Sequence, residues 1–125
     1  MALEENSNLV AIVDDDESVR IALQDLMQAV GLPAKAFASA EDFLNSGQQY
    51  HTACLITDVY ISGMSGLELH ARLNAEHCLI PTIFITATGD AGMRMQVVRS
   101  GALGLLSKPF SGSALLENVR AALKM

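Results

Sequence analysis

The sequence predicts a doubly wound α/β fold in which five parallel strands alternate with five helices. Two observations support this prediction. First, five short apolar runs recur along the chain, at residues 9–13, 34–37, 52–57, 81–86 and 103–106. All but the second are rich in valine, isoleucine or leucine, as expected for strands covered on both faces. Second, each run is followed by a segment with helical signals, so the order of elements is (βα)₅.

The first helix has the clearest periodicity. Gly31 follows its apolar face as a C-cap, and Pro33 prevents the helix from continuing. The residues of that face recur at helical spacing; they are Val19, Ala22, Leu23, Leu26, Met27 and Val30. The run 34–37 that comes next is short and weakly apolar, which indicates an edge strand.

Residues suited to N-capping mark the starts of the other four helices. Their side chains can accept hydrogen bonds from the free main-chain N–H groups of the first turn; they are Ser39, Ser65, Asp90 and Ser111. Asp42 and Glu68 stand three residues after the first two serines, as in a capping box. Because crossovers between parallel strands are right-handed, helices should cover both faces of the sheet. The simplest arrangement is flavodoxin-like, with strand order 2-1-3-4-5.

Length and charge narrow the class of protein. The 125 residues fit one domain, which we expect to span residues 1–125, and half of them are apolar. A net charge of −6 argues against direct nucleic-acid binding by this domain. The sequence shows no signal peptide and no apolar run long enough to span a membrane. We therefore expect a cytoplasmic protein without membrane contact, in which Cys54 and Cys78 are reduced.

Polar residues stand at the ends of four predicted strands. Asp14 and Asp15 follow the first, Asp58 the third and Lys108 the fifth, while Thr86 ends the fourth. In an open parallel sheet the carboxyl ends of the strands share one edge, where ligands bind. Clustered carboxylates gain from a cation such as Mg²⁺, and a carboxylate can also act as a nucleophile. Taken singly, the aspartates could merely cap a helix or form a turn, but together they indicate a site for a divalent metal and a phosphoryl group.

On these residues the chain resembles the receiver domains of two-component response regulators over essentially its whole length. The resemblance rests on four motifs: the acidic pair in Val13-Asp14-Asp15, Asp58 with Gly66 eight residues later, Ile85-Thr86-Ala87, and Lys108-Pro109-Phe110. Gly89-Asp90 followed by Met93 is further similar to the FixJ-type subgroup, whose members usually carry a carboxyl-terminal helix-turn-helix.

The resemblance implies a role for each residue. Asp58 would be the phosphoacceptor for a histidine kinase phosphohistidine, and Lys108 and Thr86 would hold the phosphoryl oxygens. The Mg²⁺ ligands would be Asp15, Asp58 and the main-chain carbonyl of Tyr60, with Asp14 acting through water. Such a protein is no enzyme in the usual sense, but an acceptor that assists its own phosphorylation and dephosphorylation.

The resemblance also implies partners and an output. The partner would be a sensor histidine kinase. Phosphorylation would switch the surface formed by helix 4, strand 5 and helix 5, through which a homodimer could form. The output would be transcription, through a DNA-binding effector domain that this chain lacks. The chain would be either a stand-alone receiver or the amino-terminal part of a longer regulator, and the FixJ-type resemblance favours the second.

Two positions depart from the family pattern. Ile61-Ser62 stands where the family usually has Met-Pro, which predicts a less rigid loop because serine lacks the fixed φ of proline. Leu105 replaces the usual Tyr or Phe three residues before the lysine, so an aromatic rotamer switch is not expected. Leu105 is either an exposed apolar spot or a simple packing residue.

Three other functions compete with this interpretation. A phosphatase of the haloacid-dehalogenase kind needs a second aspartate where Tyr60 stands. A flavodoxin-like FMN protein needs a phosphate-binding loop where this chain has four adjacent acids. A phosphorylation-independent receiver could serve as a docking module, which the intact site residues disfavour. We expect the three histidines to be surface residues without a role in the site; they are His51, His70 and His77.

Overall fold

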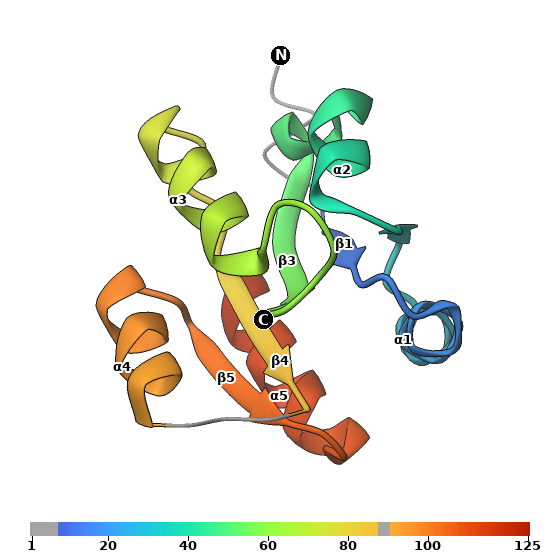
Figure 1. The fold of residues 1–125 in the computed structure, drawn as a ribbon. Coiled ribbons are helices and arrows are strands. Elements are labelled where there is room, and N and C mark those ends of the chain that lie inside the picture. Colours follow the sequence, from blue (N-terminus) through green and yellow to red (C-terminus); the bar gives the residue numbers. More distant parts are fainter. Residues whose placement is uncertain (1–7, 88–90) are drawn as a thin grey trace.

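The structure, a computed structural model, describes residues 8–87 and 91–125. Five parallel strands form a sheet in the order β2-β1-β3-β4-β5, which confirms the predicted fold (Figure 1). The strands are β1 (Leu9–Val13), β2 (Ala34–Phe37), β3 (Thr52–Asp58), β4 (Thr82–Thr86) and β5 (Gly104–Ser107). The helices are α1 (Glu17–Ala29), α2 (Ala40–Ser46), α3 (Gly66–Ala75), α4 (Ala91–Ser100) and α5 (Gly112–Leu123), with a short 3₁₀ turn η2 (Gln48–Tyr50).

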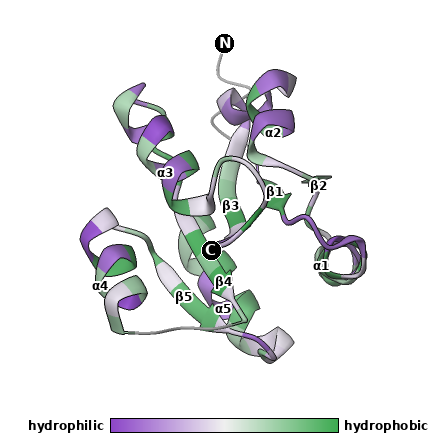
Figure 2. Cartoon of the chain, in the orientation of Figure 1, coloured by the Kyte–Doolittle hydropathy of each residue, from purple (hydrophilic) through white to green (hydrophobic). Residues whose placement is uncertain are grey.

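Both faces of the sheet are covered by helices. On one face, α1 and α5 pack on alternate strand residues such as Val10 and Ile12. On the other, α2 and α3 pack on Ala11 and Val13, and α4 packs on Phe84. Figure 2 shows β1, β3 and β4 as largely apolar ribbons between helices of mixed polarity. Burial on both faces explains why the central strands appear in the sequence as continuous apolar runs rather than alternating ones.

The predicted caps form at the helices whose starts are described. Ser65 and Glu68 make both bonds of a capping box at α3. The hydroxyls of Ser39 and Ser111 accept main-chain hydrogen bonds at α2 and α5. At α2 this is the one bond of the predicted capping box that the described residues form. Asp90, the predicted cap of α4, lies outside the described residues. The C-cap of α1 is Val30, one position earlier than the predicted Gly31, which follows it with φ of 78°.

One expectation about a histidine was wrong. His70 is not a surface residue: it is buried on α3, with its ring edge-on to that of Phe84 at a centroid distance of 5.6 Å. It lies four residues after Gly66 and three before Leu73, which are both buried on the same helix face. Burial lowers the pKa of His70. This histidine is therefore part of the core between α3 and β4.

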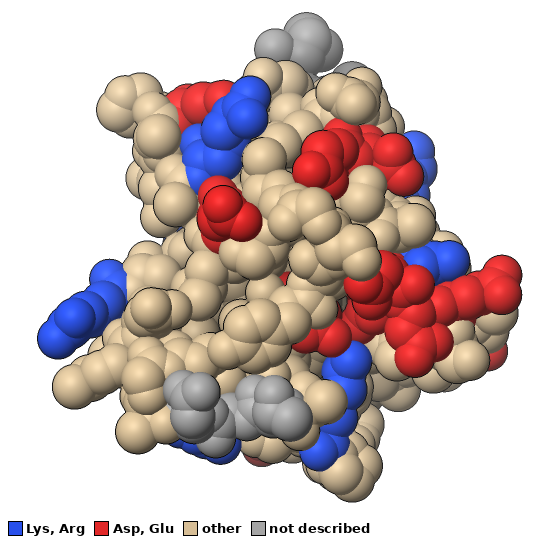
Figure 3. All heavy atoms as spheres, in the orientation of Figure 1, with Lys and Arg blue, Asp and Glu red and all other residues tan. Residues whose placement is uncertain are grey.

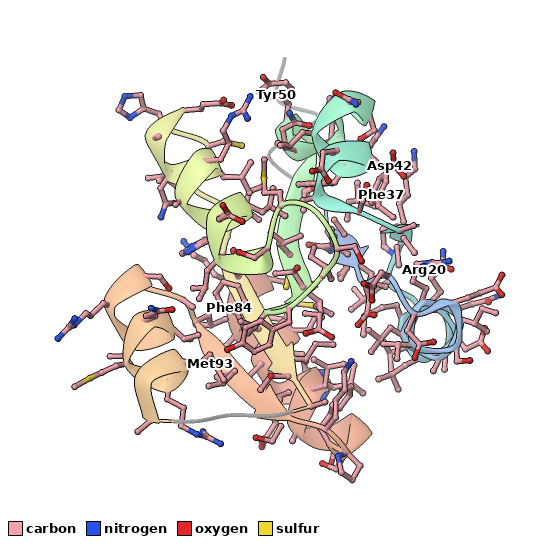
Figure 4. All side chains as sticks on the ribbon, viewed as in Figure 1. Arg20, Phe37, Asp42, Tyr50, Phe84 and Met93 are labelled. Carbon is pink, nitrogen blue, oxygen red and sulfur yellow. The ribbon has the colours of Figure 1, made fainter. Side chains whose placement is uncertain are left out.

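Of the two roles left open for Leu105, the structure supports packing. Leu105 is half-buried and packs against the group formed by Phe84, Met93 and Val97, as a packing residue would. Figure 4 shows Phe84 and Met93 beside each other between β4 and α4.

Cys54 is a buried free thiol, and burial raises its pKa to about 12. Within the described ranges, no helix is both long enough and apolar enough to cross a bilayer.

Candidate functional site

The carboxyl ends of β1, β3 and β5 bring three charged side chains into contact. The Nζ atom of Lys108 lies 2.8 Å from Oδ2 of Asp58 and 3.4 Å from Oδ2 of Asp14. These residues are separated by 50 and 94 positions in the sequence. The sheet topology alone therefore assembles the predicted cluster, with one ammonium group between two carboxylates.

Asp14 is held from three sides. Its Oδ1 accepts a hydrogen bond from the N–H of Asp16 at 2.9 Å, and its main-chain oxygen accepts one from Nη1 of Arg20 at 2.8 Å. Arg20 belongs to the first turn of α1 (Figure 4). The side chain of Asp14 is almost wholly buried. Burial, opposed by the Asp16 hydrogen bond and by Lys108, raises the pKa of Asp14. This carboxylate is therefore costly to keep charged without a cation beside it.

Lys108 is positioned by its main chain. Its N–H donates to the carbonyl oxygen of Thr86 at 2.7 Å, and the bond to Pro109 is cis. Burial by itself would lower the pKa of Lys108, but the hydrogen bond to Asp58 and the charges of Asp14 and Asp58 outweigh it and raise that pKa. The side chain is thus a fixed positive charge at the site.

Asp58 is the last residue of β3 and is buried apart from a small fraction of its surface. Its Oδ1 accepts the N–H of Tyr60 at 3.0 Å, while Oδ2 faces Lys108. Behind it, a Cβ atom added at Gly66 would collide with the main-chain oxygen of Asp58. The N–H of Gly66 also donates to the oxygen of Val59 at 3.0 Å. Glycine is thus required for α3 to begin this close to the strand end.

Asp15 lies at the exposed side of the cluster. Its Oδ2 accepts two hydrogen bonds from Ser62, one from the main-chain N–H and one from the hydroxyl, both at 3.2 Å. Further along the same loop, Oε2 of Glu41 accepts the N–H of Met64 at 3.1 Å. The loop between β3 and α3 is therefore held by a residue of the β1–α1 loop and by a residue of α2.

Thr86 and Tyr60 border the cluster. Thr86 ends β4, is fully buried, and pairs in register with Ser107, the residue before Lys108. The N–H of Tyr60 contacts Asp58, and its side chain is 56% exposed. Three residues to which the sequence assigned no role contact this region. Arg20 bonds to Asp14 and Ser62 bonds to Asp15. Glu41 bonds to Met64 of the β3–α3 loop.

The residues present are suited to Mg²⁺. In the described part of the chain no three acidic, histidine or cysteine side chains are grouped as a preformed metal cage. Lys108 contacts both Asp14 and Asp58. Mg²⁺ does not need such a cage, since it binds one or two carboxylates and keeps several waters. Figure 3 shows acidic atoms gathered over α1, where Asp15, Asp16 and Glu17 are exposed. Oxygen donors and excess negative charge both favour a hard cation.

Comparison with known proteins agrees with this geometry. Residues 10–120 match the family model of the response regulator receiver domain. The chain belongs to this family. The FixJ-N crystal structure is similar to the receiver domain with a TM-score of 0.83 and 34% identity, covering 93% of each chain. This neighbour confirms the FixJ-type resemblance.

Two curated relatives support the same assignment. Response regulator protein TmoT of Ectopseudomonas mendocina is 39% identical to the receiver domain over 123 residues, which are 98% of this chain and 56% of that protein. Nodulation protein W of Bradyrhizobium diazoefficiens is 42% identical over 114 residues, which are 91% of this chain and 50% of that protein. The receiver domain thus spans about half the length of these relatives.

Proposed function

We propose that this receiver domain accepts a phosphoryl group on Asp58 from the phosphohistidine of a sensor histidine kinase. The observation that supports the proposal is the contact of Lys108 with both Asp58 and Asp14 at the carboxyl edge of the sheet. An aspartate at a strand end, beside a second carboxylate and a fixed ammonium group, has what a phosphoacceptor needs: a nucleophilic oxygen and a positive charge for the incoming phosphoryl oxygens.

In the proposed step a carboxylate oxygen of Asp58 forms a bond to phosphorus. The bond between phosphorus and the histidine nitrogen breaks, and the imidazole leaves with the electron pair and is protonated. The ammonium group of Lys108 and the hydroxyl of Thr86 hold phosphoryl oxygens. Phosphoryl transfer depends mainly on such positioning and charge neutralisation. The chain therefore acts as an acceptor that assists its own modification, rather than as an enzyme acting on other molecules.

We infer that Mg²⁺ is the cofactor of this transfer. Its ligands would be Asp15, Asp58 and the main-chain oxygen of Tyr60, with Asp14 contributing through water. When bound, the ion neutralises negative charge on the carboxylates and on the phosphoryl group. The buried and costly charge of Asp14 and the exposed position of Asp15 both support a cation at this edge.

For the output we propose a switch of the surface formed by α4, β5 and α5, through which two phosphorylated copies pair. The exposed apolar side chains Met95 and Val98 of α4 support an interface there. The net charge of −6 argues against DNA contact by this domain itself. The regulators among the relatives of this chain suggest what the output is. It would be control of transcription in the cytoplasm by a DNA-binding output domain of the full regulator.

The decisive test is Mg²⁺-dependent labelling of Asp58 by acetyl phosphate, followed by intact-mass spectrometry. Wild type should gain one phosphoryl group only when Mg²⁺ is present, and Asp58→Asn should gain none. Asp25→Asn, which changes an exposed aspartate of α1, is the matched control and should label normally. Labelling of Asp58→Asn would refute the assignment. A wild type that neither labels nor binds beryllofluoride would instead indicate a phosphorylation-independent docking module.

A further inference from the structure

Ser62 stands at a position where the family usually has proline, and it makes two contacts that proline could not make. The main-chain N–H and the hydroxyl of Ser62 both donate to Oδ2 of Asp15, each at 3.2 Å. Proline has neither group, so it could make neither bond. Ser62 therefore connects the β3–α3 loop to Asp15 of the β1–α1 loop, 47 positions away.

The two bonds have a geometric consequence for Asp15. Both go to the same oxygen, Oδ2, and the structure gives Oδ1 no hydrogen bond from a described residue. A carboxylate held through one oxygen presents the other in a defined direction. Side chains that ligate metals are commonly fixed in this way by hydrogen bonds from neighbours, which set their orientation.

The loop that carries Ser62 is itself held in place. The N–H of Met64 donates to Oε2 of Glu41 at 3.1 Å, and Glu41 lies in the first turn of α2. At its start, the N–H of Tyr60 donates to Asp58. Ser62 is therefore a fixed donor rather than a free surface hydroxyl, and it can hold Asp15 in one orientation.

We propose that Ser62 is a positioning residue for the metal site: by bonding to Oδ2, it holds the carboxylate of Asp15 in the orientation that would bind Mg²⁺. The inference rests on the proposed function, in which Asp15 is a metal ligand. It goes beyond that function because it assigns a role to a residue that departs from the family pattern. If Ser62 instead competed with Mg²⁺ for the carboxylate of Asp15, removing its hydroxyl would strengthen Mg²⁺ binding rather than weaken it.

The test is calorimetric titration of Mg²⁺ into the metal-free protein without any phosphodonor. Ser62→Ala removes the hydroxyl and should weaken Mg²⁺ binding by about tenfold, the lower end of the range for such neighbours of a ligand, because both side chains are exposed. Ser62→Thr keeps a hydroxyl and should bind within about twofold of wild type. Ser46→Ala is the matched control and should bind as wild type does, because this exposed serine ends α2 and its hydroxyl bonds only to nearby main-chain groups.

The outcomes separate the two proposals. If Ser62→Ala binds Mg²⁺ as tightly as wild type or more tightly, the positioning role is wrong while the metal site stands. If wild type itself binds no Mg²⁺ at millimolar concentration, the proposed metal-dependent function fails, and the role of Ser62 fails with it. If Ser62→Ala unfolds at the titration temperature, Ser62→Gly replaces it, because glycine also lacks the hydroxyl. Mg²⁺ binding by Ser62→Gly as tight as that of wild type would then overturn the proposal.

Discussion

Nζ of Lys108 lies 2.8 Å from Oδ2 of Asp58, and the same ammonium group also lies 3.4 Å from Oδ2 of Asp14. Lys108 thus forms ion pairs with two carboxylates, and that of Asp14 is almost wholly buried. The lysine is an internal counter-charge that keeps the acidic edge of the sheet stable when no other cation is bound. A cation that binds between the carboxylates would share this task with it.

Lys108→Ala should therefore destabilise the domain in metal-free buffer. Removing one partner of a fully buried ion pair costs roughly 3–5 kcal/mol, and because 23% of the Lys108 side chain is exposed we expect about 1–3 kcal/mol. Mg²⁺ should reduce the loss by supplying positive charge. Urea unfolding with and without Mg²⁺ measures both effects. Lys35→Ala, at an exposed lysine of β2, should change little. A Lys108→Ala protein as stable as wild type would show that the contact contributes nothing.

Gly66→Ala tests the close approach of α3 to Asp58 at the end of β3. The added Cβ would collide with the main-chain oxygen of Asp58, so strand and helix must move apart. We expect a loss of about 1–3 kcal/mol, as for other overpacked sites, together with slower labelling of Asp58. Gly112→Ala is the matched control, because its Cβ would meet only the side chain of Leu26 at 3.6 Å. That variant should be unchanged or up to about 1 kcal/mol more stable. Equal stabilities for the two variants would contradict the steric argument.

His70 should make the stability of the domain depend on pH. Burial lowers its pKa below the ordinary 6.5, so the unfolded state binds the proton more tightly. The stabilisation from His70 is then fully present above 6.5 and is lost as the pH falls through the lowered pKa of the folded state. Since phenylalanine cannot titrate, His70→Phe should lose less stability than wild type on acidification. Urea unfolding above and below this range measures the difference. His51→Phe changes an exposed histidine and should keep the pH dependence of stability that wild type has. If the stability of His70→Phe and of wild type falls in parallel with pH, His70 is not the cause.

The sequence predicted what depends on local pattern and missed what depends on contacts between distant loops. The strands could be located because burial on both faces demands apolar runs. The contact of Lys108 with Asp14 and Asp58 could be predicted because these charges stand at strand ends that share one edge. The bonds of Ser62 to Asp15 and of Glu41 to Met64 join residues 47 and 23 positions apart, and no periodicity marks them. The burial of His70 did leave a signal, since it shares helical spacing with Leu73, but its polarity suggested a surface residue.

The lifetime of a phosphorylated Asp58 should depend on Tyr60. Hydrolysis of an aspartyl-phosphate requires a water in line with the leaving carboxylate. Tyr60 stands two residues after Asp58, and Thr88 stands two residues after Thr86. Thr88 lies outside the described residues. The side chain of Tyr60 is 56% exposed and has no amide or carboxylate to position a water, whereas its bulk can shield the phosphoryl group.

Tyr60→Asn should therefore shorten the phosphate lifetime. A change of about 1–2 kcal/mol in the barrier corresponds to roughly tenfold in rate. The measurement is the decay of the phosphorylated protein after removal of acetyl phosphate, followed by intact mass in the presence of Mg²⁺. Tyr50→Asn, at an exposed tyrosine of η2, is the matched control and should decay like wild type. If Tyr60→Asn loses its phosphate no faster than wild type, the side chain does not shield the site, and only the main chain of Tyr60 takes part.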